Sequence, residues 1–327
     1  MVSAVRLGVR PIADESLGVR SMSILVETPD VKILFDASSS LAPRRYGLPP
    51  HPEEFKAQLR VREEILKAAS RADVVTVSHY HRDHYSPPYA SLYECLRENE
   101  YEEIYSGKVV VAKHPEELIN YSQRRRAEAF LEAVRGKAKE IHLLNQGVLR
   151  FGGTEIEAFT ARHGESLGYV LCFVVRVDGS PFLAFLPDVQ GPVDDEVVEK
   201  ILAYAPEYVV VGGPPLYLSE QKVSGEAVEK GLRNLVRLFT LTQRGTRVIV
   251  SHHMLRDPEW RDALIQRGVH EDEIETYSSL LGLPFTGLEA YRKLLFSSNP
   301  PPSDYENLLE KFKGKRCDLL LESLGLQ

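Results

Sequence analysis

The sequence contains few cysteines, and their placement argues against one class of protein. Only 3 of its 327 residues are cysteine. Cys95, Cys172 and Cys317 lie far apart and form no Cys-x-x-Cys pair. We therefore predict no disulfide framework, which is typical of a chain that works in a reducing interior.

Long apolar runs are also lacking. The longest ones, such as residues 169–175, are far shorter than the about 20 residues that a membrane-spanning helix needs. Arg6 and Arg10 interrupt the start of the chain, which has no continuous apolar segment of the kind found in signal peptides. We therefore expect a cytoplasmic protein that does not associate with membranes.

Positive charge is not in excess either. Lys and Arg number 40 against 47 Asp and Glu, a formal net charge of −7. This balance argues against a strongly cationic nucleic-acid binder, although it permits a local basic groove. The hydrophobic fraction of 43% supports a substantial core, and the length fits one large α/β domain or about two average ones.

Short apolar runs alternate with helical stretches along the chain. Residues 21–27 and 31–36, separated by a Pro-Asp turn, predict a hairpin. Further strands are expected at 73–78, 109–112, 140–144, 154–160, 168–177, 182–186, 208–211 and 246–251. Helices are expected at 52–69, 91–98, 116–134, 195–203 and 224–241. This mixture predicts an α/β protein in which two mixed sheets pack together with helices outside.

A proline cluster at residues 299–302 is the one strong break in this pattern, and an amphipathic terminal helix is expected after it at about 305–324. We therefore predict a single main domain at 1–298 and a C-terminal helical extension at 299–327 that packs on it.

Histidine is the informative residue type. The segment from Ser78 to His84 contains the string H-x-H-x-D-H directly after a predicted strand. Residues two apart in an extended chain point the same way, so His79 and His81 can hold one metal ion. A turn then brings Asp83 and His84 round to a second ion. Open sites built from histidine and aspartate, without thiolates, are typical of catalytic Zn²⁺ centres. The alternative is a polar surface turn that is rich in histidine.

This string resembles the defining motif of the metallo-β-lactamase superfamily. The resemblance implies a four-layer αββα sandwich and covers most of the chain, because further ligand positions appear in the expected order after predicted strands. It assigns His79, His81 and His163 to one ion and Asp83, His84 and His252 to the other, with Asp188 bridging them. It also implies that Asp36, at the end of the second strand, supports the site.

His252 and His253 are adjacent, so either could be the last ligand. We favour His252 because it follows a serine, as His79 does. The remaining histidines are interpreted as ordinary polar residues: His51, His114, His142 and His270.

The segments flanking the motif resemble an uncharacterised archaeal family of predicted metal-dependent hydrolases. The resemblance implies two divalent ions per chain, with Zn²⁺ favoured over Mn²⁺ or Fe²⁺. It also implies attack by a metal-bound hydroxide on an ester, a lactone or a phosphodiester. Asp83 would orient the nucleophile and accept its proton.

Two segments are candidates for reading the substrate. Arg44 and Arg45 could supply cations for an anionic substrate, the alternative being a solvated surface pair. Gly212 and Gly213, followed by Tyr217, belong to a loop that should lie at the same sheet edge as the metals.

Two other functions remain open. The first is a nuclease that processes RNA or DNA, which the net charge and the lack of a large insertion between Asp188 and His252 disfavour. The second is a non-catalytic metal-binding protein, which the full set of ligand positions disfavours. A small molecule or a phosphodiester is the expected substrate.

Overall fold

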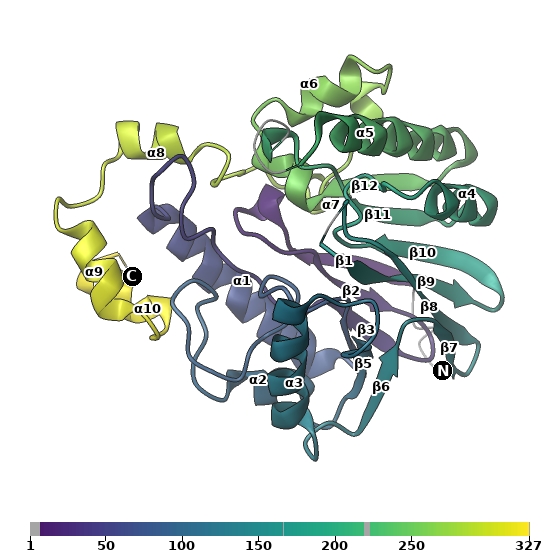
Figure 1. The fold of residues 1–327 in the computed structure, drawn as a ribbon, viewed down its shortest axis with the longest axis horizontal. Coiled ribbons are helices and arrows are strands. Elements are labelled where there is room, and N and C mark those ends of the chain that lie inside the picture. Colours follow the sequence, from purple (N-terminus) through teal and green to yellow (C-terminus); the bar gives the residue numbers. More distant parts are fainter. Residues whose placement is uncertain (1–6, 166, 219–222, 327) are drawn as a thin grey trace, which may run out of the picture.

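The computed structural model describes residues 7–165, 167–218 and 223–326. Its core is two six-stranded mixed sheets packed face to face (Figure 1). Large aromatic residues interlock between them: the Phe35 ring lies 5.4 Å from that of Phe173 and 4.9 Å from that of Phe185, centroid to centroid.

The first sheet runs in sequence order from β1 to β6. The first three strands pair antiparallel and the next three join them in parallel. The strands are β1 (Gly8–Ala13), β2 (Ser23–Glu27), β3 (Lys32–Phe35), β4 (Val74–Val77), β5 (Val109–Lys113) and β6 (Glu140–Leu144).

The strands of the second sheet also lie in sequence order, from β7 at one edge to β12 at the other. Strands β7 to β10 pair antiparallel, and β11 and β12 are added in parallel. The strands are β7 (Gly147–Phe151), β8 (Thr154–Arg162), β9 (Tyr169–Val177), β10 (Ser180–Leu186), β11 (Tyr208–Gly212) and β12 (Arg247–Ser251).

Helices cover the outer face of each sheet (Figure 1). The apolar core outside the first sheet includes residues of α1 (Pro52–Arg71), α2 (Glu100–Tyr105) and α3 (Tyr121–Val134). The core outside the second includes residues of α4 (Asp195–Tyr204), α5 (Gly225–Phe239) and α6 (Trp260–Ile265). Inner strands such as β4 are apolar on both faces because they are covered twice: Val74 packs between the sheets, whereas Val75 and Val77 pack under the helices. The predicted αββα sandwich is confirmed.

Shorter elements complete the chain. The 3₁₀ turns are η1 (Glu15–Leu17), η2 (Leu216–Leu218), η3 (Thr240–Arg244), η4 (His252–Arg256) and η5 (Glu271–Glu273). The remaining helices are α7 (Tyr277–Leu280), α8 (Arg292–Ser298), α9 (Tyr305–Phe312) and α10 (Cys317–Ser323). Among the described residues, no helix is both long and apolar enough to cross a membrane.

Several predicted elements differ from the structure. Residues 91–98 form a turn closed by a bridge between Ser91 and Leu96 rather than a helix, because Leu92 and Leu96 are drawn into the core. The single terminal helix is two helices, separated at Gly314, whose φ of 76° is a conformation suited to glycine. Strands β1 and β7 were not predicted.

The prediction of no disulfide was wrong. Cys95 and Cys317 form a disulfide across a sequence separation of 222, with their Cα atoms 4.8 Å apart. The pairing arises because α10 packs on α1 and so reaches the loop of Cys95. A separation of that length leaves no local pattern in the sequence. Cys172 is buried and free.

Candidate metal centre

Strand ends at one edge of the sandwich deliver the predicted ligands. The H-x-H-x-D-H string follows β4, His163 follows β8, Asp188 follows β10, and His252 follows β12. Strand β8 runs in the same direction as β10, because each pairs antiparallel with β9. The carboxyl ends of β8, β10 and β12 therefore meet at the same edge, where α/β proteins commonly bind ligands.

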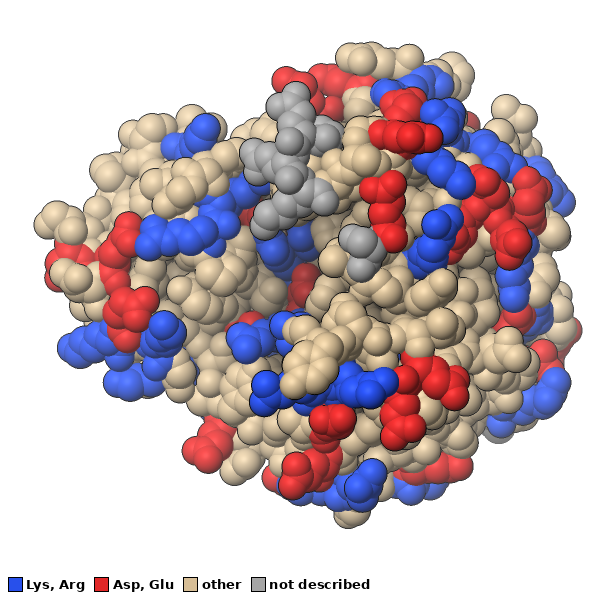
Figure 2. Space-filling model, viewed as in Figure 1, with Lys and Arg blue, Asp and Glu red and all other residues tan. Residues whose placement is uncertain are grey.

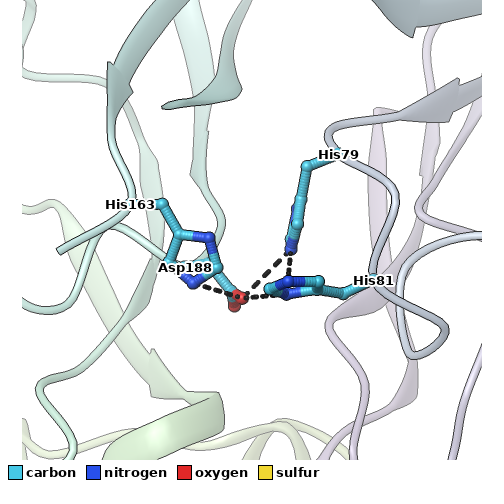
Figure 3. Close-up of side chains that lie close together, drawn as sticks. All are labelled: His79, His81, His163 and Asp188. Carbon is cyan, nitrogen blue, oxygen red and sulfur yellow. Dashed lines mark hydrogen bonds and ion pairs between the residues drawn. The ribbon is translucent and has the colours of Figure 1, made fainter. Parts of the chain in front are cut away.

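One cluster joins His79, His81, His163 and Asp188 (Figure 3). Nε2 of His79 and Nε2 of His163 each lie 3.2 Å from Oδ2 of Asp188. Nδ1 of His81 lies 3.8 Å from the same oxygen and 3.0 Å from Nε2 of His79. The donor atoms of these side chains thus converge on one point.

A second cluster joins Asp83, His84 and His252. Nε2 of His252 lies 3.3 Å from Nε2 of His84 and 3.6 Å from Oδ2 of Asp83. The other oxygen of Asp188, Oδ1, faces this cluster at 2.8 Å from His252 and 3.3 Å from His84. Asp188 therefore lies between the two clusters with one carboxylate oxygen directed to each.

The adjacent His252 and His253 occupy different positions. Nε2 of His252 belongs to the second cluster, whereas Nδ1 of His253 lies 4.0 Å from Oδ1 of Asp188 and its ring stacks near His163. Only His252 lies within the group that includes Asp83 and His84. His252 and His253 also form a further group of possible ligands with Asp188, so the choice of His252 as the last ligand stays a prediction.

Asp36 supports the site from behind. Its Oδ2 lies 2.8 Å from Nδ1 of His84, so this nitrogen can donate its hydrogen and leave Nε2 free to ligate. Its Oδ1 accepts a hydrogen bond of 2.8 Å from the backbone N–H of Ser78. Asp36 thus anchors both ends of the histidine string.

Two residues beside the second cluster were missed by the sequence analysis. Oε1 of Glu15 lies 3.1 Å from Nδ1 of His252 and accepts a hydrogen bond of 2.7 Å from Nε of Arg256. The Arg256 guanidinium also lies 3.6 Å from Oδ2 of Asp83. Glu15 follows β1, a strand that was not predicted, so no sequence signal placed it near the later histidines.

The backbone is strained where it presents these side chains. Asp36, Asp188 and His252 have φ values of 45°, 48° and 64°, in the left-handed region that residues other than glycine rarely adopt. Such conformations gather at functional sites, where surrounding packing enforces them. Each of these residues directly follows or closely follows a strand end.

Electrostatics prepares the two clusters to receive positive charge. Burial lowers the pKa of His79 and of His163, so both are neutral imidazoles, the form that ligates metals. Burial opposes charge on His252 as well, but Asp188 and Glu15 outweigh it and raise the pKa of His252 to about 9. Burial likewise disfavours the Asp188 carboxylate, yet the facing histidines, His252 first, hold its pKa well below the usual range. The centre therefore stabilises a cation close to Asp188.

The residues present fit a metal centre. Both ring nitrogens of His163, Oδ1 of Asp188 and Nδ1 of His253 are buried yet form no hydrogen bond with the described residues. Buried polar atoms are normally satisfied, and His163 and His253 each belong with Asp188 to a group of possible metal ligands. Imidazoles and carboxylates in this combination suit a borderline divalent cation such as Zn²⁺.

The predicted substrate loop divides into parts with different surroundings. A Cβ atom on Gly212 would lie 2.9 Å from the backbone N of Asp188, and one on Gly213 would lie 2.5 Å from Cβ of Met254. These glycines let the chain pack against the loops that carry Asp188 and His252. Tyr217, by contrast, lies beside Arg45 and Arg256.

Comparison with known proteins identifies the family of the chain. Residues 32–217 match the model of a beta-lactamase superfamily domain. The chain is 45% identical over 301 residues to a UPF0282 protein of Pyrobaculum neutrophilum, which covers 89% of this chain and 94% of that protein. It is 38% identical over 287 residues to a UPF0282 protein of Methanocaldococcus jannaschii, covering 86% and 94% respectively.

Among solved structures, the chain is similar to a possible metal-dependent hydrolase from Veillonella parvula, with a TM-score of 0.50 and 12% sequence identity. The match covers 83% of this chain and 95% of that one. At this identity the likeness concerns the fold alone.

Proposed function

Because the chain belongs to the metallo-β-lactamase superfamily, and within it to the UPF0282 proteins, we propose that it is a metal-dependent hydrolase acting on an ester, a lactone or a phosphodiester. The observation that carries this proposal is the meeting of two ligand clusters on the single carboxylate of Asp188. A carboxylate shared in this way is suited to hold two divalent ions close together.

In this proposal His79, His81 and His163 hold one ion, and Asp83, His84 and His252 hold the other. Zn²⁺ is the favoured metal, with Mn²⁺ and Fe²⁺ as alternatives. Bound ions would supply Lewis acidity and lower the pKa of water towards neutrality.

Two of the proposed ligands are partly exposed to solvent. The side chains of His81 and Asp83 are 29% and 14% exposed, whereas those of His79, His84 and His252 are fully buried. A substrate would therefore reach the centre from the side of His81 and Asp83.

Asp83 is the candidate proton acceptor. Burial by itself would raise the pKa of Asp83, but His84, His252 and Arg256 outweigh it and keep that pKa below its usual range. Asp83 is thus a carboxylate at neutral pH, and its Oδ2 can orient a water molecule and take up its proton.

The first test is metal content. We expect about two divalent ions per purified chain, measured by elemental analysis after reconstitution with Zn²⁺. His81→Ala should lose metal and activity with its circular dichroism spectrum unchanged, because Nδ1 of His81 belongs to the first cluster. His142→Ala is the matched control, since His142 pairs with Glu140 on β6 and should keep both ions. Wild-type metal content and activity in His81→Ala would overturn the ligand assignment.

The second part of the test concerns the substrate. Generic esters, lactones and phosphodiesters, each with Zn²⁺, Mn²⁺ and Fe²⁺ in turn, should reveal which bond is cleaved. Structured RNA at low salt belongs in the same panel, because a surface hollow of about 390 Å³ beside the histidine string is lined by Tyr89, Tyr121, Arg125 and Arg126. Exposed tyrosines and arginines suit stacked bases and phosphates. Cleavage of RNA alone would favour the nuclease alternative, and full metal loading without any hydrolysis would favour the non-catalytic one.

We also propose a cytoplasmic location. The Cys95–Cys317 disulfide is compatible with it, since disulfides do persist inside the cells of some hyperthermophiles.

A further inference from the structure

The adjacent arginines of the loop after β3 have contrasting surroundings. Arg44 points to the surface, where its Nη2 lies 2.5 Å from Oε2 of Glu306. Both partners are more than half exposed, so the charge of Arg44 is compensated and solvated. Arg44 is therefore a surface cation that forms an ion pair with the C-terminal segment.

Arg45 is held between two aromatic rings. Its guanidinium carbon lies 4.3 Å from the ring centroid of Tyr46 and 4.0 Å from that of Tyr217. A guanidinium stacks on aromatic faces in this manner while its edge stays available for hydrogen bonds. Nη2 of Arg45 also donates a hydrogen bond of 3.2 Å to Oη of Tyr46, so this side chain is held by contacts with both tyrosines.

Arg45 contacts Arg256, a residue that borders the metal centre. Its Nη2 donates a hydrogen bond of 3.1 Å to the carbonyl oxygen of Arg256. Arg256 in turn donates to Oη of Tyr217 at 3.3 Å, and its guanidinium lies 3.6 Å from Oδ2 of Asp83. Arg45 therefore lies on the side of Asp83, one of the two ligands that are partly open to solvent.

Arg45 differs from the neighbouring arginines in how its charge is paired. Arg256 is paired with Glu15, and Arg20 is paired with Glu289. Within the described ranges no carboxylate lies within 4 Å of the Arg45 guanidinium, and its buried Nε makes no hydrogen bond there. Lys293 adds a second positive charge, with Nζ 4.7 Å from the Tyr46 ring centroid.

The face in view is hollowed near its middle, and atoms of Lys or Arg and of Asp or Glu reach the walls of that hollow (Figure 2). Glu15, Asp83 and Glu289 are already engaged with arginines. Among the described residues Arg45 has no such partner, and a cation of this kind suits an anionic ligand.

We propose that Arg45, held between Tyr46 and Tyr217, binds an oxyanion of the substrate, a carboxylate or a phosphate, beside the metal centre. This inference rests on the proposed function, and it narrows the substrate class to molecules that carry a negative charge close to the bond that is cleaved. Arg45 is a specificity residue in this scheme, whereas Arg256 holds Asp83 and His252.

The test measures binding rather than turnover. Zinc-loaded protein is titrated by calorimetry with benzoate and with phenylphosphonate, which carry the two oxyanions on the same ring and are not hydrolysed. Arg45→Gln should bind the preferred probe about ten- to a hundred-fold more weakly, the range expected for loss of a charged hydrogen bond. Arg45→Lys should lie between, because it keeps the charge and loses the planar fork.

Arg44→Gln is the matched control and should bind both probes like the wild type. Elemental analysis should find unchanged metal in each variant. A loss for benzoate alone identifies a carboxylate, and a loss for phenylphosphonate alone identifies a phosphate.

Three outcomes would overturn the inference. The first is that the wild type binds neither probe. The second is that Arg45→Gln binds both probes as well as the wild type does, which would mean that the oxyanions contact the ions alone. A third is equal loss in Arg45→Lys and Arg45→Gln together with a lowered melting temperature, which would show a structural role. None of these results depends on hydrolysis, so the proposed function can fail or stand separately.

Discussion

At the scale of single residues, both histidines of the second cluster are oriented in the same way. Nδ1 of His84 faces Asp36 and Nδ1 of His252 faces Glu15, while both Nε2 atoms face Asp188. A carboxylate behind each imidazole selects the tautomer whose Nε2 can ligate. Asp36 and His84 follow the adjacent strands β3 and β4. Glu15 and His252, by contrast, are 237 positions apart in the chain.

Glu15→Gln should therefore weaken metal binding at the second cluster alone. We expect about a ten- to hundred-fold loss of Zn²⁺ affinity for one of the two ions, since a neutral amide in place of the carboxylate behind a ligating histidine lowers the basicity of that ligand. Competition with a chelator of known affinity measures it. Glu64→Gln, which removes a carboxylate from an exposed pair with Arg10, is the control. Wild-type affinity for both ions in Glu15→Gln would show that Glu15 does not orient His252.

At the scale of elements, a buried ion pair joins the start of α1 to α8. Arg292 donates to both oxygens of Glu54, at 2.8 and 2.7 Å, and both side chains are essentially inaccessible. Glu54 also accepts a hydrogen bond from the backbone N–H of His51, which closes the first turn of α1. Helix α8 is thus tied to the first sheet's helical layer although it follows the second sheet in the chain.

Arg292→Met should lower the free energy of unfolding by about 3–5 kcal/mol, because it leaves the Glu54 carboxylate buried without its counter-charge. Denaturant titration measures this loss. The double variant Glu54→Gln with Arg292→Met should recover part of it, since no buried charge remains. Arg10→Met, which breaks an exposed pair, should change the stability by less than about 1 kcal/mol. Similar losses for Arg10→Met and Arg292→Met would contradict the burial argument.

At the scale of the whole molecule, the C-terminal segment belongs to the core outside the first sheet. Tyr305, Leu309 and Phe312 of α9 pack there with α1, and Oη of Tyr305 donates to the carbonyl of Pro50 at 2.7 Å. The Cys95–Cys317 disulfide closes this contact covalently. The predicted boundary at residue 298 stays a prediction.

Thiol titration tests the disulfide directly. In denaturant without reductant we expect one reactive thiol per chain, Cys172, and after reduction all 3 cysteines should react. Reduction should also lower the free energy of unfolding by roughly 2–5 kcal/mol, because a long loop in the unfolded chain is released. A Cys95→Ser, Cys317→Ser variant should no longer respond to reductant. Three reactive thiols before reduction would disprove the disulfide.

Much of the fold could be predicted because its signals are local. The hairpin of β2 and β3, helix α1 and the strands that carry ligands follow from apolar runs and turn residues. Strand β7 was missed since only Leu149 within it is buried, so its pattern is weak. The turn at residues 91–98 was mistaken for a helix because tertiary packing outweighed its local propensity.

The sequence by itself determined the order of strands and the residue types at their ends, and so the candidate ligands. Only the tertiary structure decided which distant groups meet: Glu15 beside His252, Arg45 beside Tyr217, and Cys95 against Cys317. The reason is physical. Strand and turn preferences act between neighbours in the chain, whereas these contacts arise when packing of two sheets and their helices brings together residues that are far apart in sequence.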